Sequence, residues 1–173
     1  LDNPLQDIPL YGVLHAYLGG FSEEEIAMVR AAYPKKKYLY DALSACAEEA
    51  GDSAETLIGE ALLQRIRDFL AKVKKYRAFA VHSSVHELLQ IILRESGYLH
   101  HVAVRPEGAR RRANVEMLLV KAADYEKTSY FGLYHFLRYI EQLQKYEVDC
   151  GEAAMQDENA DVVRIMSVHK SKG

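Results

Sequence analysis

The chain has 173 residues, of which 49% are hydrophobic and 27% charged. That is enough for one domain with a real core, and it excludes disorder as the dominant state. The apolar runs are far shorter than the roughly 20 residues that span a bilayer, and no secretory leader opens the chain. Cys46 and Cys150 fit free thiols better than a disulfide framework. These features predict a cytoplasmic protein without a membrane segment.

The charge balance limits contact with nucleic acid. The 22 basic residues against 25 acidic ones give a net charge of −3, whereas a compact nucleic-acid module is usually strongly positive. Any DNA contact made by this chain is therefore expected to be local and shared with sequence elsewhere.

The first part of the chain is expected to form three short helices, over residues 5–18, 22–32 and 38–50. Gly19 and Gly20 end the first one. Ser22 and Glu25 match a capping box, in which each side chain satisfies a backbone N–H at the start of the second helix. Pro34 disfavours helix at the residue before it and so ends that helix.

Apolar residues at intervals of three and four predict further helices over residues 54–76, from Ser83 or Ser84 to Gly97, around 115–122, and from about 129 to 143. His100 and His101 follow Gly97 and are read as a surface loop pair. Residues 149–161 are small and acidic and also read as a loop.

Residues 162–168 are β-branched and mostly apolar, which predicts a short buried strand. A lone strand after seven helices forms no sheet by itself, so its partners are expected in a neighbouring α/β domain. The chain also begins without Met and stops just after this strand. We therefore expect an excised piece of a larger protein, with a mainly α, multi-helix subdomain over 1–160 and part of a second domain over 161–173.

Motifs for catalysis are absent from the sequence. It holds no Walker A loop, no Gly-x-Ser-x-Gly and no dinucleotide fingerprint. His82 and His86 have the spacing of zinc ligands on one helix face, but Ser83 stands where the zincin pattern needs Glu, and no third ligand is well spaced. We predict no catalytic residue, metal ligand or cofactor in this chain.

Several basic or polar patterns are candidates for phosphate contact. The basic clusters are residues 35–37, 72–77 and 110–112. Each either neutralises phosphates or is a solvated helix end, and both readings stay open. The turn Gly19, Gly20, Phe21 and Ser22 enters a helix N-terminus, where free N–H groups form a phosphate seat; glycine turns before capped helices are also common for structural reasons.

A second pattern follows the predicted strand, where Ser167, His169, Lys170 and Lys172 come in quick succession. A hydroxyl, an imidazole and two ammonium groups suit contacts with phosphate and sugar. A strand that runs into a polar loop explains the same residues equally well.

Residues 165–173, Ile-Met-Ser-Val-His-Lys-Ser-Lys-Gly, resemble motif V of the UvrD/Rep-type superfamily 1 DNA helicases, which is usually Thr-x-His-x-x-Lys-Gly. Residues 2–10 and 20–25 resemble the entry to subdomain 2B of those enzymes, and residues 111–118 and 128–140 also fit the family. The likeness is greatest to the A subunit of the AddAB helicase–nuclease. The chain departs from the family at Ser167, which replaces Thr, and at residues 15–17, where His-Ala-Tyr replaces a frequent Arg-Ser-Pro.

This resemblance implies a parent enzyme that uses ATP and Mg²⁺ to unwind duplex DNA ends and, with a second subunit, degrades them in recombinational DNA repair. The chain would supply the 2B-like insertion and motif V, with no ATPase activity of its own. Ser167 and His169 would contact the single-stranded DNA backbone, Lys170 and Lys172 would add charge, and the Gly19–Ser22 turn would touch the duplex. The alternative is a helical protein–protein interaction module without DNA contact.

Overall fold

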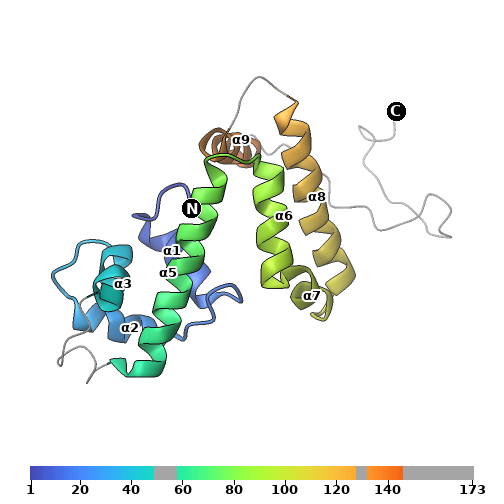
Figure 1. The fold of residues 1–173 in the computed structure, drawn as a ribbon. Coiled ribbons are helices and arrows are strands. Elements are labelled where there is room, and N and C mark those ends of the chain that lie inside the picture. Colours follow the sequence, from blue (N-terminus) through green and yellow to red (C-terminus); the bar gives the residue numbers. More distant parts are fainter. Residues whose placement is uncertain (49–57, 128–131, 146–173) are drawn as a thin grey trace, which may run out of the picture.

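The computed structural model describes residues 1–48, 58–127 and 132–145, which form helices joined by turns, with no strand among them. The helices are α1 (Asp7–His15), α2 (Glu23–Ala32), α3 (Leu39–Glu48), α5 (Glu60–Ala80), α6 (Val85–Ser96), α7 (Tyr98–Ala103), α8 (Gly108–Glu126) and α9 (Leu133–Lys145) (Figure 1). The prediction of a mainly α fold is confirmed for this part of the chain. The expected strand over 162–168 lies outside the described residues.

Two of the helices begin with complete capping boxes. The Ser22 hydroxyl accepts a hydrogen bond from the Glu25 N–H at 3.2 Å, and the Glu25 carboxylate accepts one from the Ser22 N–H at 2.9 Å. Ser84 and Glu87 repeat this arrangement at the start of α6, at 3.2 and 3.0 Å. The predicted helix start at Ser22 is confirmed, and of the two candidates Ser83 and Ser84 the structure has Ser84 as the cap. Each capping serine satisfies a donor that a helix start leaves open.

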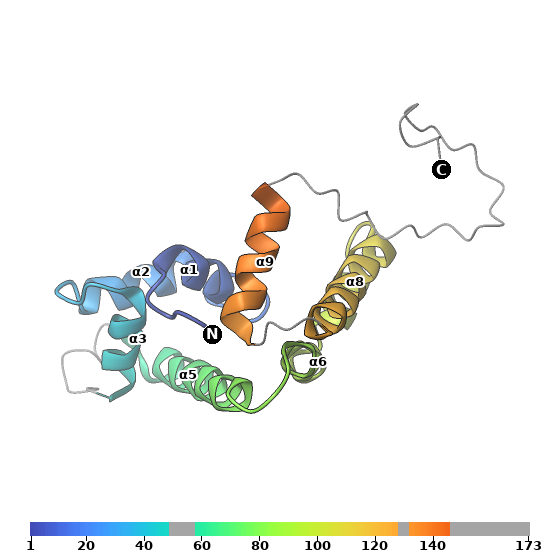
Figure 2. The ribbon, with the colours of Figure 1, turned by 90° about the horizontal axis from the view of Figure 1, so that it is seen from above.

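Helices α1, α2, α3 and α5 form one half of the described structure, in which α1, α2 and α3 lie along one side of the long helix α5 (Figures 1 and 2). Leu14, Leu63 and Ile66 are completely buried in its core, and Phe21 meets Phe69 edge-on with ring centroids 5.9 Å apart. The core is made by residues from all four helices and the turns between them: Leu14, Phe21, Ile26, Val29, Leu39, Ala42, Leu43, Cys46, Ile58, Leu62, Leu63, Ile66 and Phe69.

The other half contains α6, α7, α8 and α9 and has a smaller, more aromatic core. Figure 1 shows α5, α6 and α8 side by side, with α6 running opposite to the other two. Tyr125 of α8 packs against Phe136 and Tyr139 of α9, with ring centroids 5.4 and 5.1 Å apart. Val85 and Ala122 complete the buried cluster. The aromatic pairs therefore attach α9 to the α6–α8 pair.

Polar and aromatic contacts join the two halves. The Glu95 carboxylate on α6 accepts a hydrogen bond from Lys75 at 2.6 Å and one from the Tyr76 hydroxyl at 2.9 Å, both on α5. Tyr17, after α1, stacks on His101 of α7 with ring centroids 3.8 Å apart and an angle of 17° between the rings. Each half thus has its own apolar core, and these polar and aromatic contacts connect the two.

Two expectations need correction. His100 and His101 lie in helix α7, not in a loop. Gly97 adopts a left-handed conformation, with φ of 66°, that ends α6 and at once starts α7, whereas the sequence pattern indicated only a stop. Helix α5 spans Glu60–Ala80 and begins directly after Gly59, with φ of 75°, whereas the sequence pattern predicted one helix over 54–76; residues 54–57 lie outside the described residues.

Within the described part of the chain, none of the helices is both long and apolar enough to cross a bilayer.

Candidate nucleic-acid interface

The turn from Gly19 to Ser22 is compact, and its backbone donors are used inside the protein. The Gly20 N–H donates to the Ala16 carbonyl at 2.8 Å, and the Phe21 N–H donates to the Leu14 carbonyl at 2.9 Å. The Gly19 N–H donates to the carbonyl of Ala16 at 3.1 Å, and the Ser22 N–H is held by Glu25. A phosphate at this turn would have to compete with these bonds.

Carboxylates also occupy the start of α2 that follows the turn. Glu25 completes the capping box. The Ser22 hydroxyl donates a hydrogen bond to Glu24, and this bond is the main cause of the lowered pKa of the Glu24 carboxyl. The backbone N–H of Glu24 adds to this effect. Since a helix N-terminus attracts negative charge, its own glutamates here take the place that an anion would take. The geometry therefore gives the turn a clear structural role, and its contact with DNA stays a prediction.

Arg65 of α5 binds this turn through its guanidinium group. Its guanidinium lies over the Phe21 ring, 4.8 Å from the centroid, and donates to the Gly20 carbonyl and to Glu25, both at 2.5 Å. Sequence reasoning did not single out Arg65, because its partners lie 40 and 45 residues away. No local spacing signals such a contact.

The basic cluster at the start of α8 is engaged in local contacts. Arg110 lies 3.6 Å from Glu107, Arg111 donates to the Pro106 carbonyl at 3.0 Å, and Arg112 pairs with Glu116 at 2.8 Å. These contacts favour the reading of residues 110–112 as a solvated helix end.

The lysine cluster at 35–37 lies in the turn before α3. Arg30 of α2 donates to the carbonyls of Lys36 and Lys37, at 2.8 and 3.1 Å, and so fixes the backbone of this turn. The Lys37 ammonium lies over the Tyr38 ring, 4.9 Å from its centroid. Lys35 is exposed. The turn is therefore ordered by α2, while part of its charge faces solvent.

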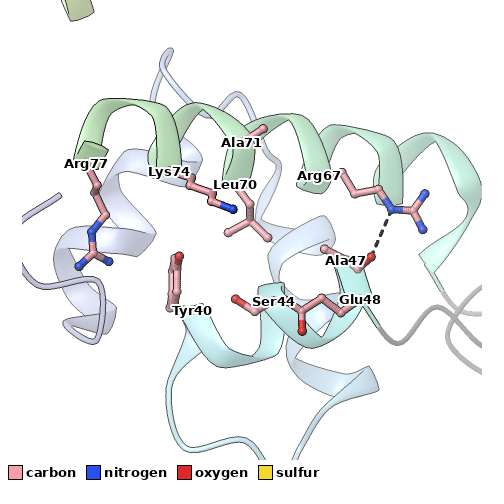
Figure 3. Close-up of a pocket in the computed structure, with 9 residues that line it drawn as sticks. All are labelled: Tyr40, Ser44, Ala47, Glu48, Arg67, Leu70, Ala71, Lys74 and Arg77. Carbon is pink, nitrogen blue, oxygen red and sulfur yellow. Dashed lines mark hydrogen bonds between the residues drawn. The ribbon is translucent and has the colours of Figure 1, made fainter. Parts of the chain in front are cut away.

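The basic cluster of α5 is different because part of it lines a groove against α3. The groove has a volume of about 410 Å³, and its lining residues are Tyr40, Ser44, Ala47, Glu48, Arg67, Leu70, Ala71, Lys74 and Arg77 (Figure 3). The polar lining residues of α3 are four positions apart, and the basic lining residues of α5 are seven and three positions apart. Each set therefore lies on one face of its helix. We call this feature the α3–α5 groove.

Charge is distributed unevenly along the α3–α5 groove. Figure 3 shows Lys74 and Arg77 at the end where Tyr40 lies, and Glu48 toward the end of Arg67. Arg67 donates to the Ala47 carbonyl at 3.3 Å and lies 3.5 Å from Glu60. Among the described residues, no carboxylate pairs with Lys74 or Arg77. One end of the groove therefore presents two uncompensated cations. The sequence indicated the cluster 72–77 but not which of its members share a groove, and it missed Tyr40 and Ser44.

The second predicted interface, Ser167, His169, Lys170 and Lys172, lies outside the described residues. His86 uses its ring nitrogens within the C-terminal half, where Nδ1 lies 2.9 Å from the Leu119 carbonyl and Nε2 lies 2.9 Å from the Gln90 amide. In the described ranges, no three His, Cys, Asp or Glu side chains gather as a metal site would require.

Comparison with known proteins covers the whole chain. It is 37% identical over 173 residues to the A subunit of the ATP-dependent helicase/nuclease of Clostridium beijerinckii, and 41% identical over 174 residues to its counterpart from Bacillus licheniformis. Every residue of the chain falls within these matches. The chain is similar throughout to one region of ATP-dependent helicase/nuclease A subunits. The resemblance drawn from the motifs is confirmed. No family model matches the chain.

The matched region is a small part of each A subunit. The chain spans 14% of the length of the Clostridium beijerinckii and Bacillus licheniformis proteins, and 12% of the one from Heliobacterium modesticaldum, to which it is 41% identical over 176 residues. The similarity thus concerns one stretch of a much longer protein.

Proposed function

We propose that this chain is part of the A subunit of an ATP-dependent DNA helicase/nuclease that unwinds and degrades duplex DNA ends in recombinational repair. The observation that carries the proposal is the similarity to A subunits over the entire chain. Residues 1–160 would form the 2B-like helical insertion, and residues 161–173 would belong to the motor domain that carries motif V. The all-helical arrangement of the described residues is consistent with such an insertion.

In this proposal the chain supplies contacts instead of catalysis. ATP and Mg²⁺ would bind elsewhere in the parent protein, because this sequence has no loop that cradles the β- and γ-phosphates of ATP. Ser167 and His169 would contact the backbone of single-stranded DNA, and Lys170 and Lys172 would add positive charge. The Gly19–Ser22 turn would approach the duplex as part of the 2B-like surface. A second subunit would complete the complex, which we expect to work in the cytoplasm.

The experiment that tests this proposal replaces His169 with Ala in the complete parent protein, together with its partner. Unwinding of a blunt duplex should slow at least tenfold, while thermal unfolding stays unchanged, because the imidazole would act on DNA and not in a core. The matched control is His82→Ala, which removes an exposed imidazole from the α5–α6 turn and should leave unwinding unchanged. Equal unwinding by the His169 variant and the wild type would refute this assignment.

The second candidate is a helical protein–protein interaction module without DNA contact. The net charge of −3 favours it, as do the exposed apolar side chains of α1, among which Ile8 is 87% exposed. A binding measurement with a duplex that carries a single-stranded tail separates the two candidates. Binding through phosphates weakens steeply between about 50 and 200 mM salt, whereas an interaction module should show no salt-dependent affinity for this DNA.

A further inference from the structure

We infer that the α3–α5 groove binds the phosphate backbone of a DNA strand, with Lys74 and Arg77 as the groups that contact phosphate. This inference rests on the proposed function and deepens it, because it assigns DNA contact to a surface that neither the glycine turn nor motif V includes. It starts from a groove of about 410 Å³ between two helices of the N-terminal half.

The first argument is electrostatic. The chain is net negative, yet the groove collects three cations and one carboxylate. Arg67 is partly neutralised by Glu60 and by the Ala47 carbonyl at the C-terminal end of α3. Lys74 and Arg77 have no such partner among the described residues. Positive charge therefore remains at one end of the groove, while Glu48 makes the other end less favourable for an anion.

The second argument is the chemistry of the opposite wall. Tyr40 and Ser44 of α3 place hydroxyl groups across from Lys74 (Figure 3). Phosphate oxygens accept several hydrogen bonds at once, and Lys, Arg, Ser and Tyr are among the residues that contact them in protein–DNA complexes. Two cations facing two hydroxyl groups, each able to donate a hydrogen bond, can therefore bind the oxygens of a phosphodiester.

The third argument is the shape and rigidity of the groove. Leu70 and Ala71 of α5 and Ala47 of α3 form its apolar part, and the small alanines leave room for a sugar next to the phosphate. The core of the N-terminal half, to which both helices contribute buried side chains, lies beneath it. Because both walls belong to packed helices, the cations are presented on a fixed support. Lys74 and Arg77 are three residues apart, so they are neighbours on the helix surface.

The test measures the affinity of the 173-residue chain for a fluorescent duplex with a single-stranded tail, at several salt concentrations from about 50 to 200 mM. The groove variant is Lys74→Gln with Arg77→Gln. The matched control is Arg110→Gln with Arg112→Gln, which removes the same charge from the exposed start of α8, outside the groove. Circular dichroism verifies that both variants remain helical.

For the groove variant we expect weaker binding and a slope of log affinity against log salt that is smaller by about 1.4 to 1.8. This is roughly 0.7 (single strand) to 0.9 (duplex) for each of the two phosphates no longer neutralised. The control should keep the slope of the wild type. A third variant, Tyr40→Phe, retains the ring but not the hydroxyl, and we expect its affinity to fall about fivefold, as for the removal of one hydrogen bond.

The outcomes separate this inference from the proposed function. Equal slopes for the groove variant and the control, with the wild-type chain still binding DNA, would overturn the inference and leave the helicase proposal intact. No salt-dependent DNA binding by the wild-type chain would overturn the inference and favour the interaction module. The unwinding experiment on His169 tests the helicase proposal independently, since it changes a different residue and measures unwinding instead of the salt dependence of binding.

Discussion

Arg65 lies across the ring of Phe21, with its guanidinium carbon 4.8 Å from the ring centroid, and from there reaches both sides of the glycine turn. One terminal nitrogen donates to the Gly20 carbonyl and the other to the Glu25 carboxylate. Phe21 itself is 4% exposed and packs against Phe69 of α5. The link from α1 to α2 is thus fixed to α5 by one buried ring and one arginine.

Replacing Arg65 with Ala should lower the free energy of unfolding by about 1–2 kcal/mol, since the change removes a cation–π contact and two charge-assisted hydrogen bonds at a partly exposed site. Urea unfolding of the chain, followed by circular dichroism, measures the effect. Arg112→Ala is the matched control: it breaks an exposed pair with Glu116 on α8 and should cost less than about 0.5 kcal/mol. Equal decreases for the two variants would contradict the role given to Arg65.

The two glycines of the α1 region should respond in opposite ways to a methyl group. A β-carbon at Gly19 would lie 2.3 Å from the Leu14 carbonyl oxygen and 2.5 Å from the Leu14 Cα, both backbone atoms that cannot move aside. A β-carbon at Gly12, inside α1, meets nothing within 4 Å. We expect Gly19→Ala to destabilise the chain by about 2 kcal/mol or more through overpacking, and Gly12→Ala to stabilise it by about 0.5–1 kcal/mol.

Thermal unfolding of both variants beside the wild type measures these shifts. The midpoint should fall for Gly19→Ala and rise for Gly12→Ala. A neutral result at Gly19 would mean that the close approach of the turn to α1 does not hold in solution.

Local sequence signals predicted the parts of the fold that depend on neighbouring residues. Ser22 was expected to cap a helix because Glu25 stands three positions later, and Ser83 or Ser84 was expected to cap another. The structure has complete capping boxes at Ser22 and Ser84. Helix α7 was missed since it has only six residues and no apolar stripe of its own. The left-handed Gly97 that separates α6 from α7 looks, in sequence, the same as a glycine that ends a helix.

The candidate site could be predicted only in part, because its geometry depends on contacts between distant residues. The cluster 72–77 was recognised from its composition, but only the packing of α3 on α5 selects Lys74 and Arg77 as groove residues. The opposite problem arose at the Gly19–Ser22 turn. The sequence pattern indicated open N–H groups, whereas the fold directs those donors to carbonyls of α1 and the residue after it and to Glu25.

Acid should weaken the contact between the two halves. Hydrogen bonds from Lys75 and then from Tyr76 lower the pKa of Glu95 below its ordinary 4.5. A carboxyl whose pKa is lowered on folding stabilises the protein above its unfolded pKa, and this stabilisation disappears as the pH falls through the folded value. The Glu95→Gln variant should therefore lose less stability than the wild type when the pH falls from about 5 toward 3.

Urea unfolding at a series of pH values measures this difference. Glu116→Gln serves as the control, since it leaves the contacts of Glu95 intact and changes only an exposed pair within α8. If wild type and Glu95→Gln lose stability in parallel over this range, the carboxylate does not join the halves in solution.

Alkaline pH should also weaken the contact between Tyr76 and Glu95, through ionisation of the Tyr76 hydroxyl. Burial, followed by the hydrogen bond to Glu95, raises the pKa of Tyr76 to about 12 from an ordinary value of 10. A group whose pKa is raised on folding stabilises the protein below its unfolded pKa, and this contribution disappears as the pH rises through the folded value. The wild type should thus lose stability between pH 10 and about 12 more steeply than Tyr76→Phe, which cannot ionise at this position.

Tyr11→Phe is the control: it removes an exposed hydroxyl on α1 and keeps Tyr76, so its loss of stability with pH should follow that of the wild type. A curve for Tyr76→Phe that coincides with those of the wild type and Tyr11→Phe would show that Tyr76 does not contribute to the alkaline destabilisation.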